Sequence, residues 1–206
     1  MDNNKKFWQR FAKIYGTFMK SADKGYAEIE EKVKPYISAE MNVLELACGT
    51  GQLSFRLAEY AGNWEATDFS ENMIREAKNL QKKNKISKNL TFSLQDATNL
   101  PYDAESFDAV MIANALHIMP EPEKALAEIK RVLKKDGVLL APTFVHGEGV
   151  GFALRTGLIE LFGFKAFLKP TNEEFAAFIR ENGFQVIAHE GIGSRVAPLC
   201  CLIAKK

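Results

Sequence analysis

The segment of the chain with the clearest chemical potential is Glu45-Leu-Ala-Cys-Gly-Thr-Gly51, which ends a short apolar run and precedes residues at helical spacing. Glycines directly after a strand let the backbone approach a ligand closely, and the helix behind them offers free backbone N–H groups. Asp68 stands at the expected end of the next apolar run. An acid at that place accepts hydrogen bonds from both hydroxyls of a ribose. The pattern therefore predicts a nucleoside-binding site.

Two residues narrow the kind of nucleoside. Dinucleotide-binding sequences carry a third glycine where the pyrophosphate lies and the helix packs closely, and here that position is Ser54. Glu45 stands on the first strand, just before the glycines. A carboxylate there attracts an ammonium group and repels a pyrophosphate. We therefore expect the ligand to be a nucleoside that carries an amino acid.

The elements that must position these residues alternate along the chain. Short apolar runs predict seven strands, at 43–47, 64–67, 90–94, 107–113, 138–144, 184–189 and 199–204. Helical spacing predicts helices at 26–33, 70–81 and 121–133, a helix directly after Gly51, and a helix that opens at Thr171 and ends at Gly183. This order predicts an α/β fold with a mainly parallel sheet and helices on both faces.

With these residues in place, the sequence resembles the class I S-adenosylmethionine-dependent methyltransferases, most of all the broad group that includes the ubiquinone/menaquinone-biosynthesis methyltransferases. The resemblance rests on five motifs in order: Val43–Gly51, Thr67–Met73, Asp96–Tyr102, Ser106–Val110 and Glu128–Leu133. It implies a Rossmann-like fold with a seven-stranded sheet whose last strand is antiparallel, and S-adenosyl-L-methionine as cofactor. One departure is the turn Lys134-Lys-Asp-Gly137, where relatives usually have Lys-Pro-Gly-Gly.

The resemblance implies which residues hold the methionine and ribose parts of the cofactor. Glu45, Ala47, Gly49 and Gly51 would border the methionine part. Asp68 would hold the ribose. Taken singly, each has a structural alternative, because glycines after a strand often serve only a tight turn and an acid beside Ser70 can start a helix.

Five further residues are implied by the same resemblance. Phe69 and Met73 would flank the adenine ring, and Asp96 and Ala97 would meet its edge. Asn114, at the end of the fourth strand, would help to hold the amino-acid end of the cofactor and face the acceptor. The alternatives are that Met73 is a core residue and that Asp96 caps a loop.

We interpret the chain as a single domain, 1–206, with four parts. They are an N-terminal helical lid (1–37), a cofactor-binding core (38–148), an inserted helical cap (149–169) and a C-terminal helix with strands (170–206). Within the lid, residues 7–20 carry apolar side chains at helical spacing and are expected to close over the cofactor. A fixed helix that covers apolar surface, or one that lies on a membrane surface, remains an alternative for this segment.

Three residues are candidates for work on the acceptor: Tyr15, His117 and His146. Tyr15 would complete the acceptor pocket from the lid. His117 and His146 follow the fourth and fifth strands, at the edge where ligands bind in such folds. A sulfonium methyl group is already a strong electrophile, so a general base is needed only where the acceptor must lose a proton early. A structural role for both histidines therefore stays open.

The composition excludes several other classes. Lys plus Arg is 27 and Asp plus Glu is 26, and this lack of basic excess argues against a nucleic-acid partner. The three cysteines suggest neither a disulfide framework nor a metal site. No apolar run approaches a membrane span, and no signal peptide is apparent at the N-terminus. We expect a cytoplasmic monomer or dimer without a metal or stable membrane insertion.

The acceptor itself is not specified by the sequence. The expected lid and cap are rich in Phe, Leu, Tyr and Trp, which favours a small apolar or amphipathic acceptor such as a quinone, a lipid head group or an aromatic metabolite. Two alternatives to a methyltransferase stay open at this point. One is a non-catalytic protein that binds S-adenosylmethionine, and the other is a nicotinamide-dependent oxidoreductase, against which Ser54 and Glu45 argue.

Overall fold

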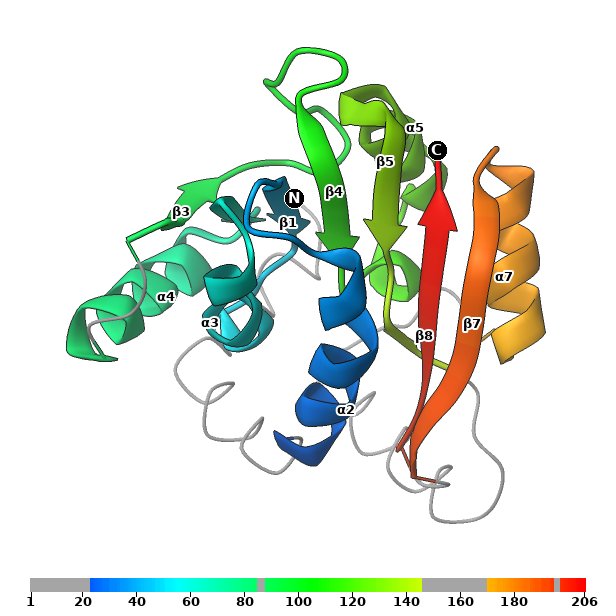
Figure 1. Cartoon of the computed structure of the whole chain (residues 1–206), viewed down its shortest axis with the longest axis horizontal. Helices are drawn as coiled ribbons and strands as arrows, with labels where there is room; N and C mark the ends of the chain where they lie inside the picture. Colours follow the sequence, from blue (N-terminus) through cyan, green and yellow to red (C-terminus); the bar gives the residue numbers. More distant parts are fainter. Residues whose placement is uncertain (1–22, 85–87, 146–169, 195–196) are drawn as a thin grey trace.

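A computed structural model describes residues 23–84, 88–145, 170–194 and 197–206. In this part of the chain, eight strands form one sheet (Figure 1). They are β1 (Asn42–Leu46), β2 (Asn63–Asp68), β3 (Leu90–Leu94), β4 (Phe107–Ile112), β5 (Leu133–Leu140), β6 (Thr143–Phe144), β7 (Gln185–Ser194) and β8 (Ala197–Lys205). Across the sheet the order is β3, β2, β1, β4, β5, β8 and β7. The short strand β6 pairs with Leu199 and Cys200 of β8, next to the stretch of β8 that pairs with β5.

Helices cover both faces of this sheet, as expected (Figure 1). The α-helices are α2 (Asp23–Val33), α3 (Gln52–Leu57), α4 (Glu71–Asn84), α5 (Pro122–Val132) and α7 (Asn172–Glu181), with 3-10 turns η2 (Lys34–Tyr36), η3 (Ala58–Tyr60) and η4 (Leu116–Ile118). The expected capping box is present at α7, where the Thr171 hydroxyl accepts from the Glu174 N–H and the Glu174 carboxylate accepts from the Thr171 N–H.

Strand direction places the ends of the central strands at one edge. Strands β1, β2, β3, β4 and β5 pair in parallel, whereas β8 is antiparallel to β5, β6 and β7. In Figure 1 the arrowheads of β4 and β5 accordingly point one way and that of β8 points the other. The prediction of an antiparallel last strand is confirmed. In such sheets the carboxyl edge of the parallel strands is where ligands bind.

The predicted count of seven strands was wrong by one within the described residues, because the expected strand 138–144 is divided. Proline has no N–H to give to a neighbouring strand, and Pro142 stands at the division. Ala141 still donates to the carbonyl of Leu202 (2.8 Å), and the carbonyl of Pro142 turns to accept from the N–H of Asn114 (2.8 Å). The division therefore links the end of β5 to the end of β4.

Two apolar cores lie on opposite faces of the sheet. One is built under α2, α3 and α4, and the other under α5 and α7. Cys200 and Cys201 are neighbours on β8, yet Cys200 belongs to the second core and Cys201 to the first. Side chains alternate across a strand, as expected for adjacent cysteines in this position.

The described part of the segment 1–37 consists of helix α2 and the turn η2 that follows it. Helix α2 buries one side in the first core through Tyr26, Ile29 and Val33. The expected lid helix at 7–20 and the expected cap at 149–169 lie outside the described residues. Among the helices that the structure describes, none has the length and apolar character that would let it span a bilayer.

Candidate active site

The turn that follows β1 has an unusual backbone. Ala47, Gly49 and Gly51 all have positive φ, of 54°, 59° and 88°. Glycine adopts this conformation freely, but Ala47 does so at a cost, and such strain concentrates at functional sites. The N–H of Cys48 donates to the carbonyl of Thr67 (2.9 Å), which ties the turn to the end of β2. The turn therefore presents its backbone at the carboxyl edge of the sheet.

Asp68, the last residue of β2, connects this turn to the start of α4. Its side chain is 6% exposed, and its two oxygens accept from the N–H groups of Gly49 and Ser70, both at 2.9 Å. Burial raises the pKa of this carboxyl to about 6, although the backbone N–H groups act in the opposite sense. The carboxyl keeps lone pairs for further donors, because each oxygen accepts more than one hydrogen bond.

Glu45 is also buried at this edge, and two side chains hold it. Its Oε2 accepts from the Ser54 hydroxyl (2.5 Å) and from the Trp64 indole N–H (2.8 Å). Burial raises the pKa of Glu45 to about 7, and nearby Asp68 adds to this, while the two hydrogen bonds lower it. Ser54 and Trp64 were not predicted as site residues. Ser54 stands where a dinucleotide-binding sequence would have its third glycine. Its hydrogen bond to Glu45 explains why a serine occupies this position.

Asn114 lies just beyond β4, beside the same turn. Its φ is 53°, and its N–H is engaged by Pro142. Its side-chain oxygen Oδ1 is buried and has no hydrogen-bond partner among the residues that the structure describes. A buried acceptor left without a donor is costly, so Asn114 Oδ1 is a candidate acceptor for a donor on a ligand or a water molecule.

The residues expected around adenine lie on the neighbouring segments. Phe69 follows Asp68, and Met73 is buried in the first turn of α4 with 2% exposure. Beyond β3, Asp96 is exposed and its Oδ1 accepts from the N–H and hydroxyl of Thr98, at 2.9 and 2.7 Å. Ala97 is half-buried. Asp96 therefore does cap its loop, and the loop itself is placed beside β2.

His117 lies in η4, three residues after Asn114. It is buried, and its Nδ1 lies 2.9 Å from the hydroxyl of Thr143. Burial lowers the pKa of this imidazole to about 4, so the ring is neutral near pH 7. Tyr15 and His146, the other two candidates for work on the acceptor, lie outside the described residues.

Glu45, Asp68 and Asn114 are candidate acceptors for a positively charged group. Three acceptors gather at the ends of β1, β2 and β4, and none of the ion pairs among the described residues involves either carboxyl. Two buried acids without a protein cation favour a ligand that brings positive charge. In the described part of the chain, no group of three or more His, Cys, Asp or Glu side chains could hold a metal ion.

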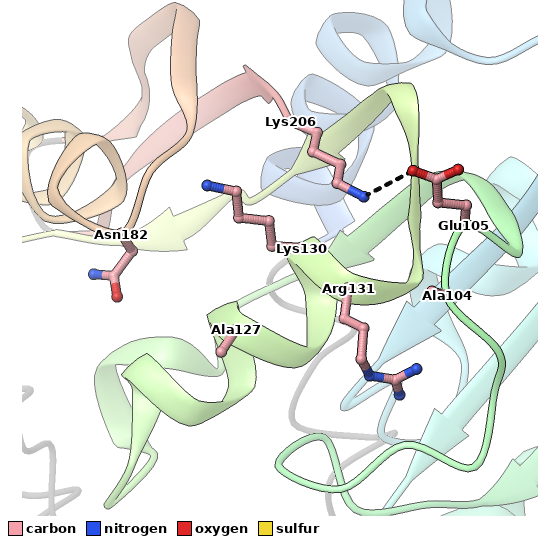
Figure 2. A pocket seen from close by; sticks show the side chains of 7 residues that line it. All are labelled: Ala104, Glu105, Ala127, Lys130, Arg131, Asn182 and Lys206. Atoms are coloured by element: carbon pink, nitrogen blue, oxygen red, sulfur yellow. Dashed lines mark ion pairs between the residues drawn. The ribbon is translucent and has the colours of Figure 1, made fainter.

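A hollow of about 600 Å³ lies at the opposite edge of the sheet. Figure 2 shows its lining, which includes Lys130, Arg131, Lys206 and Glu105. These cations already have partners, since Lys130 donates to the Gly183 carbonyl and Lys206 pairs with Glu105. None of the predicted cofactor residues lines this hollow, and the carboxyl edge, where they lie, stays the candidate active site.

Comparisons with known proteins identify the family of the chain. A sequence profile of the methyltransferase domain matches residues 37–185, which is most of the chain. The chain belongs to the methyltransferase family. It is an S-adenosylmethionine-dependent methyltransferase, and both the resemblance seen in its sequence and the Rossmann-like fold are confirmed.

A named relative supports the same family, and two solved structures share the fold. The ubiquinone/menaquinone biosynthesis C-methyltransferase of Rhizobium etli (strain CIAT 652) is 33% identical over 182 residues, covering 76% of this chain and 69% of the relative. A Haloferax volcanii methyltransferase, solved with the Trm112 activator, has a TM-score of 0.78, 17% identity and 96% coverage of both chains. Magnesium protoporphyrin IX methyltransferase from Synechocystis PCC 6803, solved with bound SAH, has a TM-score of 0.68 and 18% identity, covering 90% of this chain and 83% of that chain.

Proposed function

We propose that this chain binds S-adenosylmethionine at the carboxyl edge of β1, β2 and β4 and transfers its methyl group to a ring carbon of a small quinol. The fold and the family are compatible with many methyl acceptors and do not select one of them. The quinol is proposed because relatives such as the Rhizobium etli protein carry the name of quinone-biosynthesis C-methyltransferases. It also belongs to the apolar or amphipathic class that the composition favours.

One observation carries the binding site. Glu45, Asp68 and Asn114 are three acceptors at one edge, and the described part of the chain gives the buried Asn114 oxygen no donor. S-adenosylmethionine brings an ammonium group, a sulfonium and two ribose hydroxyls, which are the donors and the charge that such acceptors require. The residues present therefore fit this cofactor.

The roles follow from position. We assign the ammonium group to Asn114 Oδ1 and to the left-handed turn at Ala47 and Gly49, with Glu45 as the buried charge behind it. Asp68 would accept from the ribose hydroxyls. Phe69 and Met73 would flank the adenine ring, whose edge Asp96 and Ala97 would meet.

The chemistry asked of the protein is mainly positional. The cofactor supplies an activated methyl group, so the chain has to hold the acceptor carbon in line and exclude water. We assign neutral His117 the role of orienting an acceptor hydroxyl by a hydrogen bond, because Thr143 fixes its ring through Nδ1. With a pKa of about 4 it is a weak base, so we give it an orienting role and leave deprotonation to other groups.

The test has two stages. Calorimetry with S-adenosylhomocysteine and with NAD decides the cofactor, and we expect binding of the first alone. Turnover is then measured on a panel of demethylated quinols, lipid head groups and aromatic metabolites. Methylation of a quinol carbon supports the proposal. Tight cofactor binding with turnover on no acceptor would favour the non-catalytic alternative instead.

A further inference from the structure

The loop between β3 and β4, residues 95–106, carries Asp96 and Ala97 but contains no helix in the structure. A loop of this kind needs external anchors if it is to hold two residues in register with a ligand. At its start, the N–H of Gln95 donates to the carbonyl of Asp68 (3.1 Å). The anchors at its centre come from α5, on the second face of the sheet.

Glu128 and Arg131 of α5 bind the loop together. Arg131 forms a two-bond fork on Glu128, with Nε to Oε1 and NH2 to Oε2 both at 2.8 Å. Leu100 is held at both of its backbone groups, because its N–H donates to Glu128 Oε2 (2.8 Å) and its carbonyl accepts from Arg131 NH2 (3.0 Å). Two charged side chains thus fix one buried residue of the loop.

Arg131 also reaches two further points of the same loop. Its NH1 donates to the carbonyl of Tyr102 (2.6 Å), and its own backbone carbonyl accepts from the N–H of Glu105 (3.0 Å). In Figure 2 the Arg131 side chain leaves α5 on the side away from the ion pair of Lys206 and Glu105. On the sheet side, the Tyr102 hydroxyl donates to Glu65 Oε1 (2.6 Å) and completes the attachment.

The anchored residue is close to the residues that would meet adenine. Asn99, which precedes Leu100, donates its N–H to the carbonyl of Asp96 (3.0 Å), and these two residues form a bridge. Asp96 to Asn99 is therefore one closed turn that ends directly at Leu100. Any shift of Leu100 moves this turn, and with it the Asp96 carboxyl and the Ala97 N–H.

We propose that Glu128 and Arg131 form a latch that positions Asp96 and Ala97 for recognition of the adenine base. The inference rests on the proposed function, because it takes Asp96 and Ala97 as the adenine-facing pair. Glu128 and Arg131 contact the loop and not the base, so they are positioning residues. They set the preference for adenine over other bases rather than affinity for the amino-acid end.

The experiment measures a preference between two ligands. S-inosylhomocysteine differs from S-adenosylhomocysteine in having a carbonyl where adenine has its amino group, so it cannot donate to Asp96 there. Dissociation constants for both ligands are measured by calorimetry on the wild type, Arg131→Met, Glu128→Gln and Asp96→Ala. Lys124→Met is the matched control, because Lys124 lies on the same helix in an exposed ion pair with Glu121.

We expect the wild type and Lys124→Met to prefer the adenine ligand by about tenfold or more, the worth of one hydrogen bond to a charged group. Arg131→Met, Glu128→Gln and Asp96→Ala should each lose most of that preference. The ratio of the two dissociation constants is unaffected by a partly unfolded sample, because unfolding lowers the apparent affinity for both ligands by the same factor. Glu128→Gln keeps the shape of the latch should Arg131→Met fold poorly.

Three outcomes would overturn the inference at different points. Full preference in both latch variants, with loss in Asp96→Ala, rejects the latch alone. Full preference in Asp96→Ala rejects the adenine assignment on which the latch rests. A wild type that binds neither ligand rejects the proposed function itself.

Discussion

At the scale of single residues, substitution of Asp68 tests the proposed cofactor site most directly. We predict that Asp68→Ala weakens binding of S-adenosylhomocysteine by roughly 1.5–3 kcal/mol, the usual worth of hydrogen bonds to a charged group. Calorimetry measures this directly. Asp108→Ala is the matched control, since Asp108 also accepts a backbone N–H, from Asn42 (2.9 Å), but at the opposite edge. Equal affinities for the two folded variants would reject Asp68 as the ribose residue.

His117 offers a test of the acceptor side. We predict that His117→Asn lowers kcat by about tenfold, because one orienting hydrogen bond to the acceptor is lost. Affinity for S-adenosylhomocysteine should stay unchanged, because His117 is not among the residues assigned to the cofactor. Steady-state kinetics with the acceptor found by the panel decides this. Thr143→Val, which frees His117 Nδ1, should give a smaller loss of kcat.

The opposite pattern for His117 would indicate a purely structural residue. In that case His117→Asn would lower the melting temperature, because the smaller amide would leave a cavity where the buried ring packs. The rate constant kcat would stay at the wild-type value.

Residue types and spacing predicted part of this site well. Glycines after a strand and Asp68 at the end of the next strand are local signals, and the structure brings them together at one edge. The positive φ of Asn114 and the contact of Trp64 with Glu45 had no such signal. Both depend on how neighbouring strands are registered, which a single sequence does not state.

At the scale of elements, the glycine turn depends on packing as well as on backbone freedom. A Cβ added to Gly51 would lie 2.9 Å from Phe92 Cζ and 3.1 Å from the Phe55 ring, at a φ of 88°. We predict that Gly51→Ala lowers the free energy of unfolding by at least about 2 kcal/mol, from left-handed strain and overpacking together. Chemical denaturation provides the measurement.

Gly25→Ala is the matched control for that prediction. Gly25 lies in α2, and an added Cβ would lie at an ordinary distance of 3.4 Å from Leu199. Replacing a helical glycine by alanine usually stabilises, so we expect a gain of roughly 0.5–1 kcal/mol. Similar losses at both positions would mean that Gly51 is not specially constrained.

Element prediction succeeded where the signals were local and failed where they were not. The spacing Thr171 to Glu174 predicted a capping box, and 90–94 predicted β3 with its bounds. The strand 138–144 looked continuous because its residues are apolar on both sides of Pro142. The division becomes apparent only in the structure, where the Pro142 carbonyl accepts from the N–H of Asn114 rather than from a partner strand.

At the scale of the whole molecule, the buried carboxyls make stability depend on pH. Burial raises the pKa of Glu45 to about 7 and that of Asp68 to about 6, above the values of an unfolded chain. The folded state thus holds their protons more tightly. The resulting stabilisation is complete in acid and is lost as pH rises through these two values. His117 acts in the opposite sense, because burial lowers its pKa to about 4.

We therefore predict a difference between the wild type and Glu45→Gln that isolates one carboxyl. The free energy of unfolding of the wild type should fall relative to that of the variant as pH rises from about 5 to about 8, by at most about 1.4 kcal/mol per pH unit. Urea unfolding of the ligand-free proteins at a series of pH values measures this difference. Parallel pH profiles would show that Glu45 titrates as an ordinary carboxyl.

Because Cys200 and Cys201 face opposite sides of β8, each helical layer covers one thiol, and the reaction rate of that thiol can report on its own layer. Burial raises the pKa of the Cys200 thiol to about 12 and that of Cys201 to about 11, so neither reacts readily while its layer is closed. In variants that keep one of these thiols and lack Cys48, the rate of labelling reports how often that side of the sheet is uncovered. Equal rates mean that both layers open in one event, and unequal rates show which layer lifts first.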